Sequence, residues 1–313
     1  MKKIILFIAC VSLLLVLTVC GRRNDQDRQG YEIILAGGFL SETEIRNLEK
    51  TAKVWGYVKY RHPVFIKGEK CWDAELIALL PTVFNADEDE INNILYEWVR
   101  GLGDIEQNIT LSELRSYLDR LRLYGRLEET PQFKMLLQIY NDGVIPDAQT
   151  ITDIRRDLYN LIGLLDRRHQ FAILDWVADS DYLGVNLSNL LLSLDEVHLL
   201  NRRNAPVSFN LIGMPDFLGR QSLHPGMDFE DARYRLLGLF RLWNAMKYFF
   251  PYLDIIDGNW HELLPVYIPL MLEGTDRASY ELTIAMLSAH LQDAHVWFTP
   301  RTCISAYTCI LIS

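Results

Sequence analysis

The residues best suited to chemistry lie toward the C-terminal end of the chain, where acidic side chains and histidines gather in two groups. The groups are Asp257, His261 and Glu262, and then His290, Asp293 and His295. The second group has ligand types that zinc accepts. Its spacing of i, i+3 and i+5 does not keep all three side chains on one helical face. We therefore predict no metal site and no catalytic residue here, and expect helix-end capping or solvated surface.

The sequence contains none of the short motifs that usually carry catalysis or cofactor binding. It has no Gly-x-Ser-x-Gly elbow, no phosphate-binding Gly-x-x-x-x-Gly-Lys-Ser/Thr loop, no Gly-x-Gly-x-x-Gly and no His-Glu-x-x-His. Beyond the leader, the cysteines are Cys71, Cys303 and Cys309, which fit neither a disulfide framework nor a Cys-x-x-Cys metal site. The sequence thus predicts no cofactor, and Cys71 is expected to be a buried thiol.

Composition indicates an ordered chain that forms a hydrophobic core. The chain has 313 residues, of which 50% are hydrophobic, and a formal net charge of −10. This length suggests about two domains. The acidic balance excludes broad, sequence-independent nucleic-acid binding, which needs a basic face to neutralise phosphates.

The N-terminus has the pattern of an export signal. Lys2 and Lys3 precede an apolar run from Ile4 to Val19, which is shorter than the roughly 20 residues of a bilayer span and suits a secretory signal. The run leads to Cys20, where a bacterial lipoprotein would be lipidated, although Val19 replaces the usual Gly, Ala or Ser. We expect an exported chain, lipid-anchored to a bacterial membrane and facing the periplasm or cell surface. A cleaved or uncleaved signal without lipid is the alternative.

The helices that would position side chains occur twice, as a divergent internal repeat. At an offset of 188 residues, seven of 27 aligned positions are identical. The anchors of the repeat are Trp55, Lys59, Tyr60, Pro63 and Trp72 in the first copy and Trp243, Lys247, Tyr248, Pro251 and Trp260 in the second. We expect Trp55 and Trp243 to be buried and the lysines to keep their charges in water. The prolines, together with Pro81 and Pro269, are expected to end helices.

The predicted fold class is mainly α, with two divergent three-helix units joined by a mostly helical middle segment. The boundaries are a signal peptide over 1–20, a tether over 21–40, helical unit 1 over 41–106, a mostly helical middle segment and loop over 107–228, helical unit 2 over 229–297, and an atypical tail over 298–313. A period of 188 residues is far too long for a solenoid, so duplication of a small domain is the interpretation.

Both copies resemble a known protein family. The run from Tyr234 to Tyr252 (YRLLGLFRLWNAMKYFFPY), Asn259-Trp260, and the run LQDAHVW that ends at Trp297 resemble the N-terminal helical region of exported serine peptidases of family 41. These are the carboxyl-terminal-processing or tail-specific peptidases. The first copy, including Cys71-Trp72-Asp73, resembles the extra helical unit of their Bacteroidetes-type members.

The resemblance implies proteolysis in a full-length protein but not in this chain. In the family, a PDZ-like module and an α/β domain with a Ser/Lys dyad follow the helices and act on peptide or protein substrates. The chain ends 16 residues after Trp297, and no residue matches the dyad, so we expect a truncated or frameshifted reading frame. The prediction is a non-catalytic, inactive N-terminal fragment of a family 41 serine peptidase. The alternative is a stand-alone periplasmic or surface helical module that binds a peptide or protein.

Overall fold

A computed structural model describes most of the chain between its two ends. The described residues are 40–103, 105, 110–122, 126–146, 150, 151, 153, 154, 175–195, 204–209, 215–217, 227–293 and 296. The signal with Cys20, the tether up to residue 39 and the tail over 298–313 lie outside them, and the expectations about these segments stay predictions. The described chain is mainly helical, as the sequence predicts.

The first copy of the repeat contains three long helices and one short one. They are α3 (Glu42–Arg61), α4 (Pro63–Ile66), α5 (Trp72–Phe84) and α6 (Ile91–Arg100). Helix α3 begins at a capping box, in which the Ser41 hydroxyl accepts from the Glu44 backbone N–H and the Glu44 carboxylate accepts from the Ser41 backbone N–H. This exchange satisfies backbone donors that the first helical turn leaves unpaired.

The second copy repeats the three long helices. They are α13 (Ala232–Phe249), α14 (Trp260–Glu273) and α15 (Arg277–Ala289). Each begins after a residue whose side chain accepts a backbone hydrogen bond from the first turn, namely Asp231, Asn259 and Asp276. Short polar side chains at these positions are the usual N-terminal signals of a helix.

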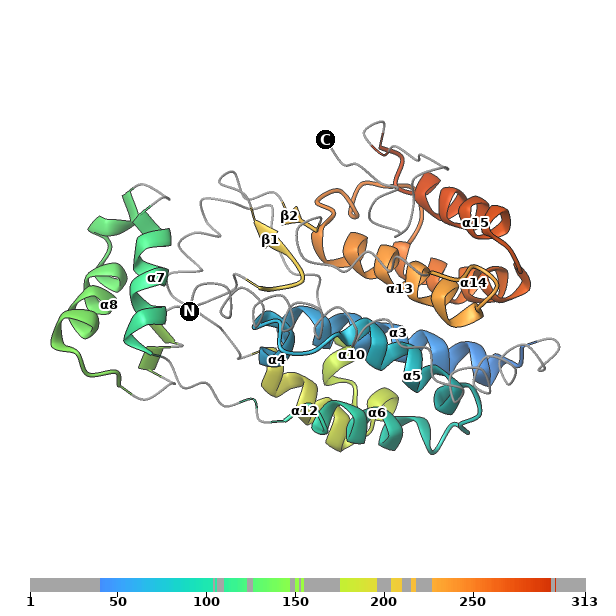
Figure 1. Cartoon of the computed structure of the whole chain (residues 1–313), viewed down its shortest axis with the longest axis horizontal. Helices are drawn as coiled ribbons and strands as arrows, with labels where there is room; N and C mark the ends of the chain where they lie inside the picture. The colour runs from blue at the N-terminus through green and yellow to red at the C-terminus, as the bar shows by residue number, and fades with distance from the viewer. Residues whose placement is uncertain are drawn as a thin grey trace, which may run out of the picture.

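The segment between the copies divides into two parts. Helix α7 (Leu111–Leu121), the 3-10 turn η2 (Arg126–Glu129) and α8 (Pro131–Asp142) gather around a hydrophobic cluster of their own and stand apart from the other helices (Figure 1). Helices α10 (Asp175–Ala178), α11 (Ser180–Leu183) and α12 (Val185–Asp195) return to the first copy, where α12 packs on α3 and α6. A two-stranded antiparallel pair, β1 (Ser208–Phe209) with β2 (Pro215–Asp216), follows.

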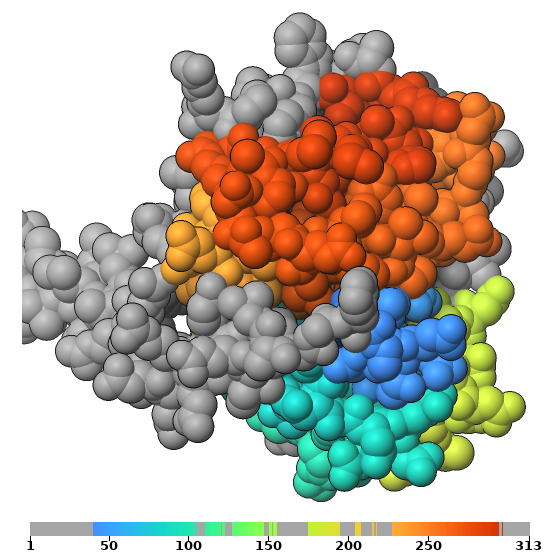
Figure 2. Space-filling view, turned by 90° about the vertical axis from the view of Figure 1, so that its right-hand side faces the viewer, coloured from blue at the N-terminus to red at the C-terminus, as the bar shows by residue number. Residues whose placement is uncertain are grey.

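The two copies are packed on one another and share a single hydrophobic core. Helix α5 of the first copy contacts α13 of the second, and α14 of the second contacts α3 of the first. In Figure 2 the second copy, coloured orange to red, lies directly on the first, coloured blue to cyan. The units are therefore halves of one helical body rather than separate domains.

Two of the four prolines do not end helices, which corrects the expectation for them. Pro63 begins α4 and Pro251 directly follows the C-cap of α13, but Pro81 lies inside α5 and Pro269 lies inside α14. A proline inside a helix removes one backbone hydrogen bond and crowds the preceding turn. Here the preceding residues are fully buried on both helices, so packing against the core offsets that cost.

Candidate functional site

A reciprocal pair of tryptophans joins two helices in each copy. In the first, the Trp55 indole Nε1 donates to the Trp72 carbonyl oxygen at 3.3 Å, and the Trp72 Nε1 donates to the Trp55 carbonyl oxygen at 2.8 Å. In the second, Trp243 and Trp260 make the same two bonds at 3.0 and 3.1 Å. All four side chains are buried, as predicted for Trp55 and Trp243. We call these arrangements the first and second tryptophan pairs.

Where the copies meet, equivalent residues of α3 and α13 face one another. The Asn244 side-chain Nδ2 donates to the Ala52 carbonyl oxygen at 3.0 Å and to the Phe240 carbonyl oxygen at 2.9 Å. Ala52 and Phe240 are 188 residues apart, as are Gly56 and Asn244. A Cβ added to Gly56 would lie only 1.9 Å from the Asn244 Oδ1. The amide thus occupies space that only glycine leaves open.

The same relation continues one helical turn further along. The rings of Tyr60 and Tyr248, again equivalent, have their centroids 5.6 Å apart in an edge contact, and Phe249 lies 4.9 Å from Tyr60. Contacts between equivalent residues at successive turns mean that α3 and α13 run parallel. The two copies are therefore related by a local two-fold axis along this helix pair.

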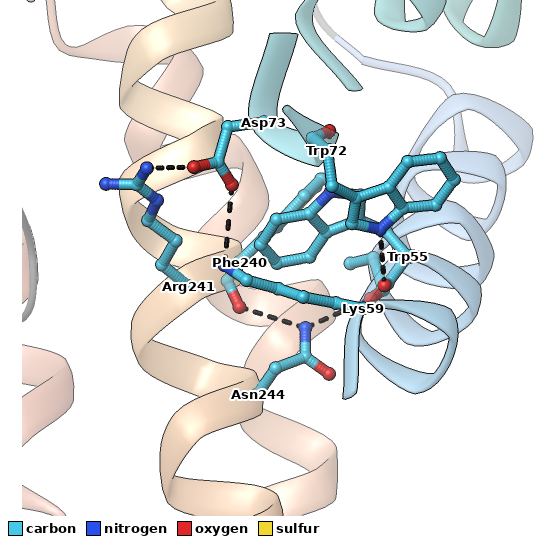
Figure 3. Close-up of polar contacts among 8 residues, drawn as sticks. Trp55, Lys59, Trp72, Asp73, Phe240, Arg241 and Asn244 are labelled. Atoms are coloured by element: carbon cyan, nitrogen blue, oxygen red, sulfur yellow. Dashed lines mark hydrogen bonds and ion pairs between the residues drawn. The ribbon is translucent and has the colours of Figure 1, made fainter. Parts of the chain in front are cut away.

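A buried ionic group, which we call the Asp73 cluster, links the copies close to the first tryptophan pair (Figure 3). The Lys59 Nζ lies 3.4 Å from the Asp73 Oδ1, and the Arg241 guanidinium donates to the Asp73 Oδ2. The side chains come from α3, α5 and α13, and they are 2%, 6% and 2% exposed for Lys59, Asp73 and Arg241. One carboxylate thus contacts a cation from each copy.

Lys59 does not keep its charge in water, which corrects the sequence-based expectation. Its Nζ lies 4.3 Å from the centroid of the Trp55 ring, so an aromatic face and the Asp73 carboxylate replace the lost water. The pKa of Lys59 is lowered to about 8. Burial is the largest cause, Asp73 opposes it, and Arg241 acts in the same direction as burial. The expectation failed because the second copy covers the lysine.

The local two-fold axis generates a second group, the His261 cluster, in which Lys247, His261 and Lys53 are equivalent to Lys59, Asp73 and Arg241. Lys247 is 4% exposed, so the expectation of a solvated charge is wrong here too. Its Nζ lies 4.8 Å from the Trp243 ring centroid and 5.2 Å from that of Trp176. A neutral imidazole replaces the carboxylate of the first cluster.

The electrostatics of the His261 cluster reflect this replacement. The pKa of Lys247 is lowered to about 7. Burial is the largest cause, Lys53 and Arg61 act in the same direction, and Glu49 opposes them. His261 is exposed as a residue, but partial burial of its ring, which makes an edge contact with Trp243, lowers its pKa to about 4, and Lys247 and Lys53 lower it further. The Lys53 ammonium is paired with Glu49 at 2.5 Å, which leaves Lys247 as the cation without an ion pair among the described residues.

The acidic and histidine groups near the C-terminal end do not converge. The His290 Nε2 lies 3.0 Å from the Tyr267 hydroxyl, Asp257 accepts from the Gln292 side chain at 3.1 Å, and Glu262 accepts from the Asn259 side chain at 2.9 Å. His295 lies outside the described residues. Within the described part of the chain, no three His, Cys, Asp or Glu residues are placed to hold a metal ion. Cys71 is a free thiol and only half-buried, rather than buried as expected.

Sequence reasoning did not single out Asp73, Arg241 or Asn244 as interacting residues. A signal for two of them is present, since the 188-residue offset aligns Asp73 with His261 and Arg241 with Lys53. The two copies thus place polar side chains at the same positions relative to a matched lysine. This indicates that these side chains have equivalent positions in the two copies. Nothing in the sequence shows that Arg241 crosses to the other copy.

Comparison with protein families, curated proteins and solved structures finds no match to the chain. Within the described residues, none of the helices combines the length and hydropathy that a bilayer span requires.

Proposed function

We propose that the paired helical units are the non-catalytic helical region of an exported family 41 serine peptidase. In that role they position a catalytic module or gate the approach of substrate. The carrying observation is that the segments resembling the family supply both tryptophan pairs and the two clusters beside them. The residues of the resemblance therefore act together, as parts of one rigid helical body.

The proposal assigns no turnover to this chain. The groups around the tryptophan pairs are held in the core by aromatic rings and ion pairs, which suits a scaffold. Export and a lipid anchor at Cys20 complete the proposal, since they would place the scaffold at a bacterial membrane, where it would meet peptide or protein substrates.

The second candidate is a stand-alone module that binds a peptide or protein by itself. Exposed apolar side chains on α14 and α15 favour it, because Val266 is 58% exposed, Leu282 is 61% exposed and Met286 is 46% exposed. Leu282 and Met286 are four positions apart on α15 and so are neighbours on its surface, and exposed apolar patches commonly mark a binding site.

Two measurements on the full chain test these candidates. The first is hydrolysis of an unstructured fluorogenic peptide with and without a serine-directed inhibitor, for which no inhibitor-sensitive turnover is expected. The second is addition of the chain to a family 41 catalytic module that lacks its own helical region, followed by measurement of kcat/KM and of binding by sedimentation.

We expect binding to the catalytic module and a changed kcat/KM. Inhibitor-sensitive hydrolysis by the chain alone would contradict the assignment as a non-catalytic region. Binding of the peptide without any binding of the catalytic module would favour the stand-alone candidate. A Leu282→Asp variant is the matched control for the stand-alone candidate. It adds a charge to the exposed apolar surface that favours this candidate and leaves the core unchanged.

A further inference from the structure

The two equivalent clusters differ in where the negative charge lies. In the Asp73 cluster, a carboxylate lies between Lys59 and Arg241. In the His261 cluster the equivalent residue carries an imidazole, whose ring centroid lies 6.1 Å from that of Trp243, the ring that Lys247 also contacts. Glu49 balances Lys53 at 2.5 Å, so the buried Lys247 ammonium is the group left without a counter-charge in the described residues. A buried cation without a partner is costly.

Two further donors beside the His261 cluster are buried and have no hydrogen-bond partner within the described chain. They are the Trp176 indole Nε1 and the Tyr182 hydroxyl. The Trp176 ring centroid lies 5.2 Å from the Lys247 Nζ, and the Tyr182 ring centroid lies 5.4 Å from the Lys53 Nζ. Buried polar groups are nearly always hydrogen-bonded in folded proteins, so these donors point to an acceptor that the described residues do not supply.

We propose that the His261 cluster binds a carboxylate group from outside the chain, in the place that the Asp73 carboxylate has in the first copy. The site is open to a ligand because His261 is exposed, whereas Asp73 is buried. Lys247 supplies the positive charge, and the indole and phenol groups are the candidate neutral donors. This inference rests on the local two-fold axis and does not depend on the proposed peptidase family.

The charges of the site favour a carboxylate over a phosphate. Lys247 is the cation of the cluster without an ion pair among the described residues, so a single negative charge is enough to pair it. The nearby Glu49 raises the pKa of Lys247 and would repel a dianion more strongly than a monoanion. In the first copy, Asp73 places a carboxylate, which is planar, between Lys59 and Arg241, the residues equivalent to Lys247 and Lys53.

The test measures the melting temperature of the full chain in acetate and in chloride at equal ionic strength and pH 6. Acetate is expected to raise the melting temperature more than chloride does. Two probes then distinguish a chain-end carboxylate from a side-chain carboxylate. N-acetylglycine carries the first, and N-acetylglutamate with its α-carboxylate capped as an amide carries the second.

Two variants make the result specific. His261→Asp supplies an internal carboxylate at an exposed position, so the acetate-dependent rise should disappear while the melting temperature in chloride increases. Lys247→Met removes the cation and should also abolish the rise. An equal effect of acetate and chloride on the wild-type chain would overturn the proposal, as would an acetate response that persists in His261→Asp.

Discussion

Replacing Asp73 with asparagine tests whether the buried charges bind the two copies together. The substitution keeps the shape of the side chain but removes the only carboxylate that contacts both Lys59, at 3.4 Å, and Arg241 in the described structure. Both cations are nine-tenths buried or more, and breaking such a pair costs about 3–5 kcal/mol. Because whole domains are stable by about 5–15 kcal/mol, the free energy of unfolding should fall by a large fraction.

The assay is urea denaturation at pH 7, followed by tryptophan fluorescence and far-ultraviolet circular dichroism. The control is Glu97→Gln, which breaks the Arg100–Glu97 pair, whose side chains are 62% and 47% exposed. This exposed pair should contribute less than about 1 kcal/mol. A triple variant with Lys59→Met, Asp73→Leu and Arg241→Met should recover most of the loss, because it leaves no unpaired charge.

The pH gives a second check on the same variant. The pKa of Lys59 is about 8 in the folded wild-type chain, so at pH 9 this lysine is mostly neutral with or without Asp73. The destabilisation by Asp73→Asn should therefore be smaller at pH 9 than at pH 7. A loss no larger than that of Glu97→Gln at pH 7 would refute the view that a buried ionic cluster links the copies.

Three further predictions concern the helix interface, the tryptophan pairs and the second cluster. Gly56→Ala should destabilise the chain by about 1–3 kcal/mol, because its Cβ would lie 1.9 Å from the Asn244 Oδ1; adding Asn244→Ala should relieve part of this loss in urea denaturation, and additive losses would contradict the contact. Trp72→Phe and Trp260→Phe each remove an indole donor and should cost similar amounts, about 1–3 kcal/mol, whereas a large effect in one copy alone would show that the pairs are not equivalent. The unfolding free energy should rise between pH 7 and pH 10 by up to about 1.4 kcal/mol per pH unit. The reason is that the folded pKa of Lys247, about 7, lies below the ordinary pKa of a lysine, so the unfolded state binds more protons. An equally steep rise in Lys247→Met would assign it to other groups.

The helical class and the burial of the tryptophans could be predicted from the sequence because both depend on local spacing. Trp55 and Trp243 lie on apolar helix faces, and large aromatic side chains at such positions are buried in almost any helical packing. The beginnings of helices were also predictable, since the Ser41–Glu44 pattern forms the capping box in the structure.

The environment of the lysines could not be predicted, because it depends on the packing of one copy against the other. A single helix suggests that Lys59 reaches solvent at the edge of its apolar face. In the structure it is covered, and the Arg241–Asp73 contact joins residues 168 positions apart in the sequence. Pro81 shows the same limit, since the local cost of a proline inside a helix is offset by the burial of Leu80 and Val83 on the same helix.

Hydrogen exchange of the tryptophan indole N–H groups, followed by two-dimensional nuclear magnetic resonance, tests the equivalence of the two copies most directly. The indole protons of Trp55, Trp72, Trp243 and Trp260 are all bound to buried carbonyl oxygens and should form the most slowly exchanging set. Trp260→Phe should accelerate exchange at Trp243, just as Trp72→Phe should at Trp55. Fast exchange at Trp243 or Trp260 in the wild-type chain, with slow exchange at Trp55 and Trp72, would contradict the shared architecture.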